Sequence, residues 1–144
     1  PQLMKLVEVV RTPLTSDEAI EAARALAIKL GKTPIVCRDS PGFIANRLAL
    51  PYINEAFYAL QEGVASPRDI DAAMKLGYGF PMGPFELCNM VGLDLILTVM
   101  ENMYRATGDS KYRPCPLLRK MVEAGYLGDK VGRGVYEFMA ALSR

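Results

Sequence analysis

The chain has 144 residues, of which 51% are hydrophobic and 23% charged, so it is long enough and apolar enough to bury a core and is not disordered. Its 17 basic and 16 acidic residues give a net charge of +1, and no segment concentrates the positive charge. This balance predicts no nucleic-acid partner and no membrane partner, and no apolar run reaches the roughly 18 residues of a membrane-spanning helix.

The sequence contains no histidine, and its three cysteines are far apart, with none in a C-x-x-C pair. A metal site is therefore not expected, because zinc would need carboxylates alone or with scattered thiols. The cysteine pattern favours a reducing compartment, and we expect a cytoplasmic protein. The chain opens on Pro1 and apolar residues without an initiator Met, which suggests one part of a longer protein.

The first forty residues predict a β-α-β unit. Residues 4–10 form an expected strand in which Met4, Leu6, Glu8 and Val10 share the face predicted to be buried. A helix is expected over 17–30, with Ser16 as its N-cap, and a second strand over 32–37. A domain boundary is predicted near Asp39, giving an incomplete first domain, 1–39, and a helical second domain, 40–144.

The rest of the chain predicts helices. A long helix over 42–62 carries apolar residues at spacings of three and four, and Pro51 should kink or divide it. Ser66-Pro67 opens a helix to about Leu76. Further helices are expected over 84–90, 92–106 and 116–124, followed by a turn and a short extended piece over 132–138. The predicted fold class is therefore mainly α, with an N-terminal β-α-β stub.

Two polar residues in apolar patterns are candidates for chemistry. A carboxylate at Glu8, on the strand face expected to be buried, is costly unless it is paired, so it is either catalytic or orienting, or simply a strand-end residue that meets solvent or a lysine. Asn46 interrupts the apolar stripe between Phe43 and Leu50, where an amide either orients a substrate carbonyl or satisfies buried backbone groups. Arg47 is interpreted as a salt-bridge residue.

Glycine-rich segments do not indicate a nucleotide site. The loop 77–84 follows no strand and lacks G-x-G-x-x-G spacing, and the segment Gly132-Arg133-Gly134 is too short. The run 91–100 is apolar around most of its circumference, which favours either a central helix or one covered by another subunit. We therefore expect a homodimer with residues 91–106 and the helix 42–62 near the interface.

The chain contains five informative segments, Met4-Lys5-Leu6-Val7-Glu8-Val9-Val10, Ser40-Pro41-Gly42-Phe43-Ile44-Ala45-Asn46-Arg47, Met82-Gly83-Pro84-Phe85-Glu86-Leu87, Val91-Gly92-Leu93-Asp94 and Gly132-Arg133-Gly134-Val135-Tyr136. Together these segments resemble one enzyme family, the L-3-hydroxyacyl-CoA dehydrogenases, and most closely the single-function 3-hydroxybutyryl-CoA dehydrogenase type. The match runs in order over nearly the whole chain. Asn89 and Val135 depart from residues common in the family, and both departures are expected to affect helix packing.

The resemblance implies an NAD-binding Rossmann domain followed by a helical domain of the 6-phosphogluconate-dehydrogenase-like C-terminal type, which binds acyl-CoA and dimerises. It implies that Glu8 is the catalytic carboxylate that pairs with a histidine upstream of Pro1, and that Asn46 positions the acyl-CoA. NAD would be bound mainly by the missing N-terminal domain, so the chain alone should be inactive. The implied setting is fatty-acid β-oxidation or the reverse, butyrate-forming direction.

Two alternatives stay open on the sequence alone. The chain could be a freestanding helical dimerisation module, or the helical half of another two-domain dehydrogenase that acts on free hydroxy acids. A histidine just before Pro1 and a G-x-G-x-x-G near the start of the full reading frame would favour the acyl-CoA enzyme.

Overall fold

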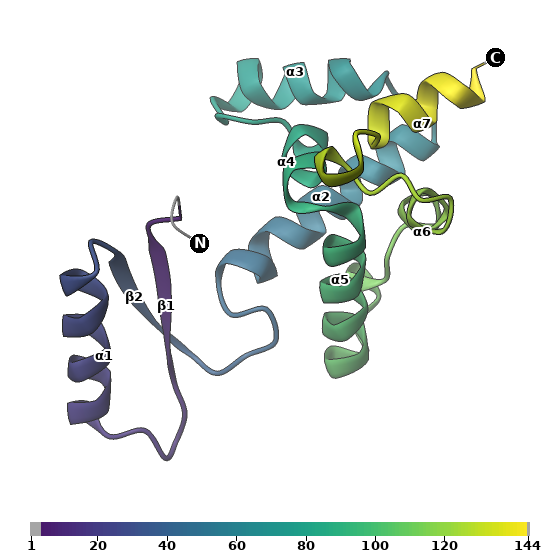
Figure 1. Cartoon of the computed structure of the whole chain (residues 1–144). Helices are drawn as coiled ribbons and strands as arrows, with labels where there is room; N and C mark the ends of the chain where they lie inside the picture. The colour runs from purple at the N-terminus through teal and green to yellow at the C-terminus, as the bar shows by residue number, and fades with distance from the viewer. Residues whose placement is uncertain (1–3, 144) are drawn as a thin grey trace. The chain divides into compact units, whose positions relative to one another are not determined.

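The computed structural model describes residues 4–143, which form two compact units, one ending at Arg47 and one beginning at Leu48. The first unit contains the strands β1 (Leu6–Arg11) and β2 (Thr33–Arg38), joined by the helix α1 (Asp17–Lys29). The strands pair in parallel, with Leu6 opposite Thr33 and Arg11 opposite Arg38 (Figure 1). The expected β-α-β stub is therefore present.

Helix α1 begins where the sequence predicts. The hydroxyl of Ser16 accepts a hydrogen bond from the backbone N–H of Ala19 at 3.1 Å, which satisfies one of the unpaired donors of the first turn. The helix buries Ile20 and Ala27 against the sheet, where Val9 is also buried.

The prediction of which face of β1 is buried was wrong. Val9, on the opposite face, is 8% exposed, whereas Met4 is 67% exposed and Glu8 is half-buried. The reason is that α1 covers the face that carries Val9, and no described element of this unit covers the other face in the same way. Both faces are apolar enough that alternation alone does not identify the covered one.

The second unit is all helical. It contains most of α2 (Ala45–Gln61), then α3 (Pro67–Tyr78), α4 (Pro84–Val91), α5 (Leu93–Thr107), α6 (Pro116–Glu123) and α7 (Val135–Leu142), with short 3₁₀ helices at Ser110–Tyr112 and Asp129–Val131. Figure 1 shows α5 and α2 among the other helices of this unit. The fold is mainly α with a short β-α-β stub, as expected.

The long helix starts later than predicted and is not divided. Gly42 and Phe43 have φ values of 79° and 47°, so this turn cannot be helical and α2 begins at Ala45. The helix then continues through Pro51 to Gln61. The predicted stripe is buried from Leu50 onward, but its first member, Phe43, is 39% exposed.

The C-terminal segment corrects another prediction, because residues Val135–Leu142 form the helix α7 and not an extended piece. The carboxylate of Glu137 accepts a hydrogen bond from the N–H of Gly134 at 2.7 Å, and Asn89 Oδ1 accepts one from Val135 at 3.1 Å. These side chains satisfy the free donors of the first helical turn, so capping overrides the strand preference of Val, Tyr and Phe here.

The core of the second unit lies around the middle of α2 and α5. Phe57 and Phe85 are fully buried and pack edge to face, with their ring centroids 5.1 Å apart. α5 buries one face, including Leu93, Met100 and Met103. Within residues 4–143, no helix combines the length and apolar character needed to cross a bilayer.

Candidate active-site residues

Glu8 lies in β1, and its carboxylate reaches the start of α2. Its Oε1 atom accepts hydrogen bonds from the backbone N–H groups of Ile44, at 2.7 Å, and Ala45, at 3.1 Å. Free N–H groups and the positive end of the helix dipole make this a favourable place for a carboxylate. The sequence pointed to Glu8 as an unusual carboxylate, but it did not indicate backbone amides as its partners.

A tight turn precedes α2 and holds the same segment. The N–H of Phe43 donates to the carbonyl of Ser40 at 2.9 Å, and the guanidinium of Arg47 donates to the Ser40 hydroxyl at 2.8 Å. Arg47 thus bonds a serine and forms no ion pair within the described chain, so its interpretation as a salt-bridge residue was wrong.

Asn46 is the second residue of α2, next to the N–H of Ala45 that Glu8 accepts. Its side chain is exposed and makes no hydrogen bond with any residue in 4–143. The expectation that it interrupts a buried stripe was wrong, because the stripe is buried only from Leu50 onward. The structure instead gives Asn46 a free amide on the turn that Glu8 holds.

Three other polar side chains are buried among the described residues: Asn54, Asp71 and Asn89. Asn54 donates to the carbonyl of Arg113 at 2.9 Å and accepts from the N–H of Cys115 at 2.8 Å. Because both partners are backbone groups, Asn54 stabilises the loop before α6. Sequence reasoning missed this role, although Asn54 directly follows Ile53 of the apolar stripe.

Asp71 connects three helices of the second unit. One oxygen accepts the N–H of Phe85 at 2.8 Å, and the other accepts the hydroxyl of Tyr136. Burial raises the pKa of Asp71, although both hydrogen bonds and the nearby Lys75 act in the opposite direction. Burial likewise raises the pKa of Tyr136, and the Asp71 charge adds to this effect.

The two positions that depart from the family pattern are in contact. Asn89 Oδ1 accepts the N–H of Val135, and a Cβ placed on Gly134 would lie 2.1 Å from that same oxygen. This contact joins the end of α4 to the start of α7. Both residues therefore serve helix packing, as expected from the sequence.

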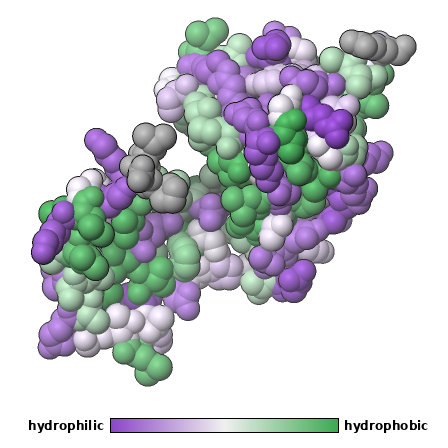
Figure 2. Space-filling model, viewed as in Figure 1, coloured by the Kyte–Doolittle hydropathy of each residue, from purple (hydrophilic) through white to green (hydrophobic). Residues whose placement is uncertain are grey.

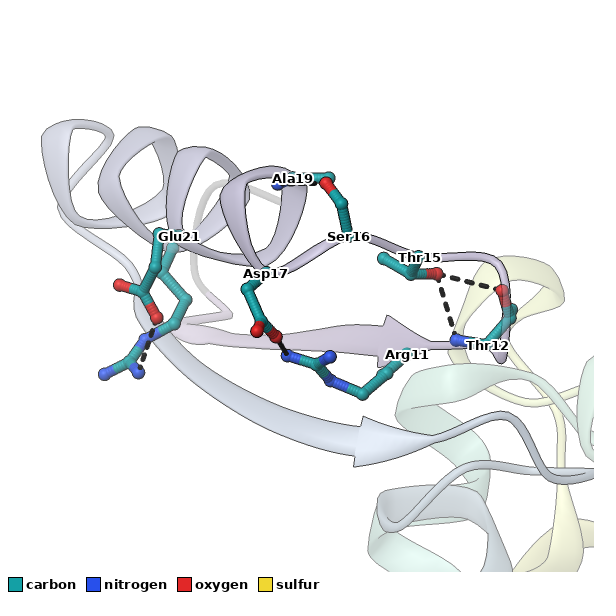
Figure 3. Close-up of polar contacts among 8 residues, drawn as sticks. Arg11, Thr12, Thr15, Ser16, Asp17, Ala19 and Glu21 are labelled. Carbon is teal, nitrogen blue, oxygen red and sulfur yellow. Dashed lines mark hydrogen bonds and ion pairs between the residues drawn. The ribbon is translucent and has the colours of Figure 1, made fainter.

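The first unit does not fit a dinucleotide pyrophosphate at its β1–α1 turn. The turn contains no glycine, Ser16 already caps α1, and Asp17 adds a negative charge paired with Arg11 at 2.7 Å (Figure 3). A pyrophosphate site at a helix N-terminus needs free N–H groups and close backbone approach. In residues 4–143, no group of three or more His, Cys, Asp or Glu side chains could hold a metal.

Comparison with known proteins places both units in one family. The sequence model of the 3-hydroxyacyl-CoA dehydrogenase C-terminal domain matches residues 42–138, and that of the NAD-binding domain of the same enzyme matches residues 1–40.

Individual relatives carry names of the same enzyme family. The chain is 55% identical over 136 residues to a probable 3-hydroxybutyryl-CoA dehydrogenase of Bacillus subtilis, covering 94% of the chain and 47% of that relative. It is 44% identical over 137 residues to the mitochondrial hydroxyacyl-coenzyme A dehydrogenase of Homo sapiens, covering 94% of the chain and 44% of the relative.

A solved structure gives the same result. The crystal structure of (S)-3-hydroxybutyryl-CoA dehydrogenase from Ralstonia eutropha superimposes with a TM-score of 0.89 at 54% identity, covering 94% of the chain and 48% of that protein. The chain thus spans about half the length of the relatives it matches. These matches extend over β1, the turn before α2 and the helical unit, and they show that the chain belongs to the 3-hydroxyacyl-CoA dehydrogenase family.

Proposed function

We propose that this chain forms the substrate side of an NAD-dependent 3-hydroxyacyl-CoA dehydrogenase, which oxidises the 3-hydroxyl of an acyl-CoA to a ketone or catalyses the reverse reaction. The observation that carries the proposal is the β1–α2 contact, in which Glu8 is bonded to the backbone beside Asn46. Family membership supplies the reaction class. The domain assignment that accompanies this proposal is 1–39 for the end of the NAD-binding domain and 40–144 for the helical domain.

Glu8 is proposed to orient the base of the reaction. Oxidising an alcohol needs a group that takes the hydroxyl proton near neutral pH, and imidazole is suited to this task. The chain has no histidine, so the imidazole must come from outside these 144 residues. A carboxylate hydrogen-bonded to it would fix its tautomer and stabilise its protonated form.

Asn46 is proposed to bind the substrate. Its amide is exposed and without a protein partner in residues 4–143, so its N–H can donate to an oxygen of the acyl-CoA. Such a donor holds the reacting carbon in place and contributes most where charge develops on the oxygen. NAD, as hydride acceptor, would be bound by residues outside the described ones, because the β1–α1 turn does not fit its pyrophosphate.

A homodimer is also proposed, with α5 and α2 near the interface. α5 buries one face in its own unit, yet Leu95 is 51% exposed on it, and Leu48 of α2 is 70% exposed. Exposed apolar residues on both helices are what a second copy could cover. Light scattering at micromolar concentration should give twice the subunit mass, and the mass of a monomer would contradict the dimer.

The substrate role is tested in the complete protein that carries this chain, with acetoacetyl-CoA and NADH. Replacing Asn46→Ala should lower kcat/KM by about 10²-fold or more, the usual loss when one preorganised donor is removed. The control is Asn102→Ala, an exposed asparagine on α5 whose side chain, within residues 4–143, only accepts a 3.3 Å hydrogen bond from Arg105. Equal kcat/KM for the Asn46→Ala variant and the wild type would refute the substrate role.

A further inference from the structure

An arginine-rich pocket lies over the C-terminal half of α5, where the loop before α6 and the first turns of α6 pack against that helix (Figure 1). Its volume is about 380 Å³, within the roughly 300–1,000 Å³ that small-molecule sites occupy. Half of the side chains around it are guanidinium groups, which makes it a candidate site for an anion. The residues that line the pocket are Glu101, Tyr104, Arg105, Arg113, Pro114 and Arg119.

The pocket carries an excess of positive charge. Among the described residues that line it, Glu101 is the single carboxylate, and its Oε1 atom lies 2.5 Å from a guanidinium nitrogen of Arg119. The guanidinium groups of Arg105 and Arg113 form no ion pair within residues 4–143. Three positive charges therefore face one negative charge, and arginine cannot lose its proton in a protein. A group with two negative charges would neutralise the excess.

Arg113 has the most available donors in the pocket. Its guanidinium makes no hydrogen bond within the described chain, whereas that of Arg105 donates to Asn102 at 3.3 Å. The backbone at Arg113 is nonetheless fixed, because its carbonyl accepts a 2.9 Å hydrogen bond from Asn54, which is 5% exposed. A guanidinium without a partner on a fixed backbone suits ligand binding, because less of the chain has to be ordered when the ligand arrives.

A phosphate monoester fits this charge better than a carboxylate does. It carries close to two negative charges near neutral pH and three strong acceptor oxygens. The planar fork of a guanidinium binds two such oxygens at once. A carboxylate brings a single charge, so it would leave one of the two excess positive charges of the pocket uncompensated.

Tyr104 gives the pocket a flat surface beside the arginines. Its side chain is partly exposed, and its ring packs against no other aromatic ring and no cation in the part of the chain that the structure describes. The face of an aromatic side chain stacks well on a nucleobase, whatever the base. The pocket thus combines donors for a phosphate with a platform for a ring.

We propose that this pocket binds a phosphate monoester joined to a flat ring, that is, a nucleotide, with its phosphate on the arginines and its ring on Tyr104. Two sources share this chemistry: a free nucleoside monophosphate, and the end of coenzyme A that carries the 3′-phosphate. Only the second source rests on the proposed function, and binding itself is measured without turnover.

Titration calorimetry on the complete protein that carries this chain tests the site. Saturating NAD⁺ is present throughout, so that a dinucleotide site is already filled. AMP should bind with a Kd of about 1 mM or lower. Inorganic phosphate should bind more weakly because it lacks the ring, and adenosine should not bind detectably because it lacks the phosphate.

Two variants separate the phosphate contact from the ring contact. Arg113→Ala should weaken the binding of both AMP and inorganic phosphate by about tenfold or more, the usual loss for a hydrogen bond to a charged group. Its fold should be unaffected, because only the exposed side chain is removed. Tyr104→Ala should weaken AMP by about tenfold and leave inorganic phosphate unchanged. The matched control is Arg24→Ala, which removes the same charge from an exposed position on α1 and should bind AMP as the wild type does.

The outcomes decide each part of the proposal. No binding of AMP by the wild type, or equal AMP affinity in the wild type and Arg113→Ala, would overturn the site. An equal loss in Arg24→Ala would also overturn it, because binding would then follow net charge alone. Normal AMP affinity in Tyr104→Ala would overturn the ring contact.

The source of the nucleotide is identified by kinetics with acetoacetyl-CoA and NADH. If the end of coenzyme A occupies the pocket, KM for acetoacetyl-CoA should rise by about tenfold in Arg113→Ala, with kcat unchanged. If the ligand is a free nucleotide, both constants should match the wild type. A complete protein without dehydrogenase activity would refute the proposed function, whereas weaker AMP binding in Arg113→Ala would still support the pocket.

Discussion

At the scale of single residues, Asp71 of the helical unit is 2% exposed and accepts hydrogen bonds from the N–H of Phe85 and the hydroxyl of Tyr136. A Cβ on Gly83 would lie 2.2 Å from its Oδ1 atom, so the backbone of the α3–α4 loop approaches this carboxylate closely. Asp71 therefore fixes where α3, α4 and α7 meet. Its burial raises its pKa, which makes the stability of this junction depend on pH.

The sign of this dependence follows from the raised pKa. The folded protein holds the Asp71 proton more tightly than the unfolded chain does, so this contribution is complete below the unfolded value near 3.8 and is lost as pH rises through the folded pKa. The variant Asp71→Asn cannot ionise and keeps an oxygen for the Phe85 N–H. Between pH 3.5 and 7, the wild type should therefore lose stability relative to Asp71→Asn, by about 1.4 kcal/mol for each unit of pKa shift.

Urea unfolding of the two proteins at several pH values measures this difference. Asp129→Asn, at an exposed aspartate whose side chain makes no hydrogen bond within residues 4–143, is the control and should track the wild type at every pH. A difference between wild type and Asp71→Asn that stays constant with pH, or that grows in favour of the wild type, would show that burial does not raise this pKa.

Single residues also show what the sequence could and could not predict. Ser16 caps α1 as expected, because an N-cap is a local signal that needs only its own helix. Glu8 was recognisable as an unusual carboxylate, but its partners are 36 and 37 residues away and are backbone N–H groups, which leave no mark on sequence patterns. The burial of Asp71 depends on its contacts with α4 and α7, so it could not be predicted from the sequence either.

At the scale of elements, local signals such as N-cap residues and proline predicted most helices. The exceptions are helix starts that are capped by side chains distant in sequence. Ser66-Pro67 opens α3 as expected, with the Ser66 hydroxyl accepting the N–H of Asp69 at 3.2 Å. The tail was predicted to be extended and is the helix α7, because Asn89 from another helix caps it. Helix α2 likewise begins at Ala45 and not at the predicted residue 42, and the carboxylate of Glu8 in β1 accepts the N–H groups of Ile44 and Ala45 at this start.

Two glycines of neighbouring elements should respond oppositely to alanine. Gly77 lies inside α3 with open space where its Cβ would be, so Gly77→Ala should stabilise by about 0.5–1 kcal/mol through lower backbone entropy. Gly83 has no such space, because a Cβ there would lie 2.4 Å from the backbone Cα of Asp71. Gly83→Ala should therefore destabilise, by about 1–3 kcal/mol as in an overpacked core.

Thermal and urea unfolding of this pair provide the test, with each glycine serving as the control for the other. Stabilisation by both alanines would mean that the α3–α4 loop does not approach Asp71 closely. Destabilisation by both would mean that the low helix propensity of Gly77 does not limit the stability of α3.

On the scale of the whole molecule, the two units differ in how much they bury. The first unit buries Val9, Ile20 and Ala27, while Leu26 and Ile28 of α1 and Leu30 directly after it stay more than half exposed. Figure 2 shows hydrophobic surface on the visible face of this unit. The second unit has a continuous core. This contrast supports the proposal that the strands and helix of the first unit pack against further parts of an NAD-binding domain.

In the proposed function, this chain supplies the orienting carboxylate Glu8 and the substrate amide Asn46, but neither the proton-accepting imidazole nor the cofactor site. The chain contains no histidine, and its β1–α1 turn does not fit a dinucleotide pyrophosphate, so both the base and the cofactor site are proposed to lie outside it. This proposal is testable because substrate contacts without a base or a cofactor site give no turnover, however well the helical unit folds.

The most direct measurement is the oxidation of NADH with acetoacetyl-CoA, followed by the loss of NADH absorbance, for the purified 144-residue chain and for the complete protein that carries it. We predict no rate above background for the chain and clear turnover for the complete protein. Measurable turnover by the 144-residue polypeptide alone, or none by the complete protein, would contradict the account.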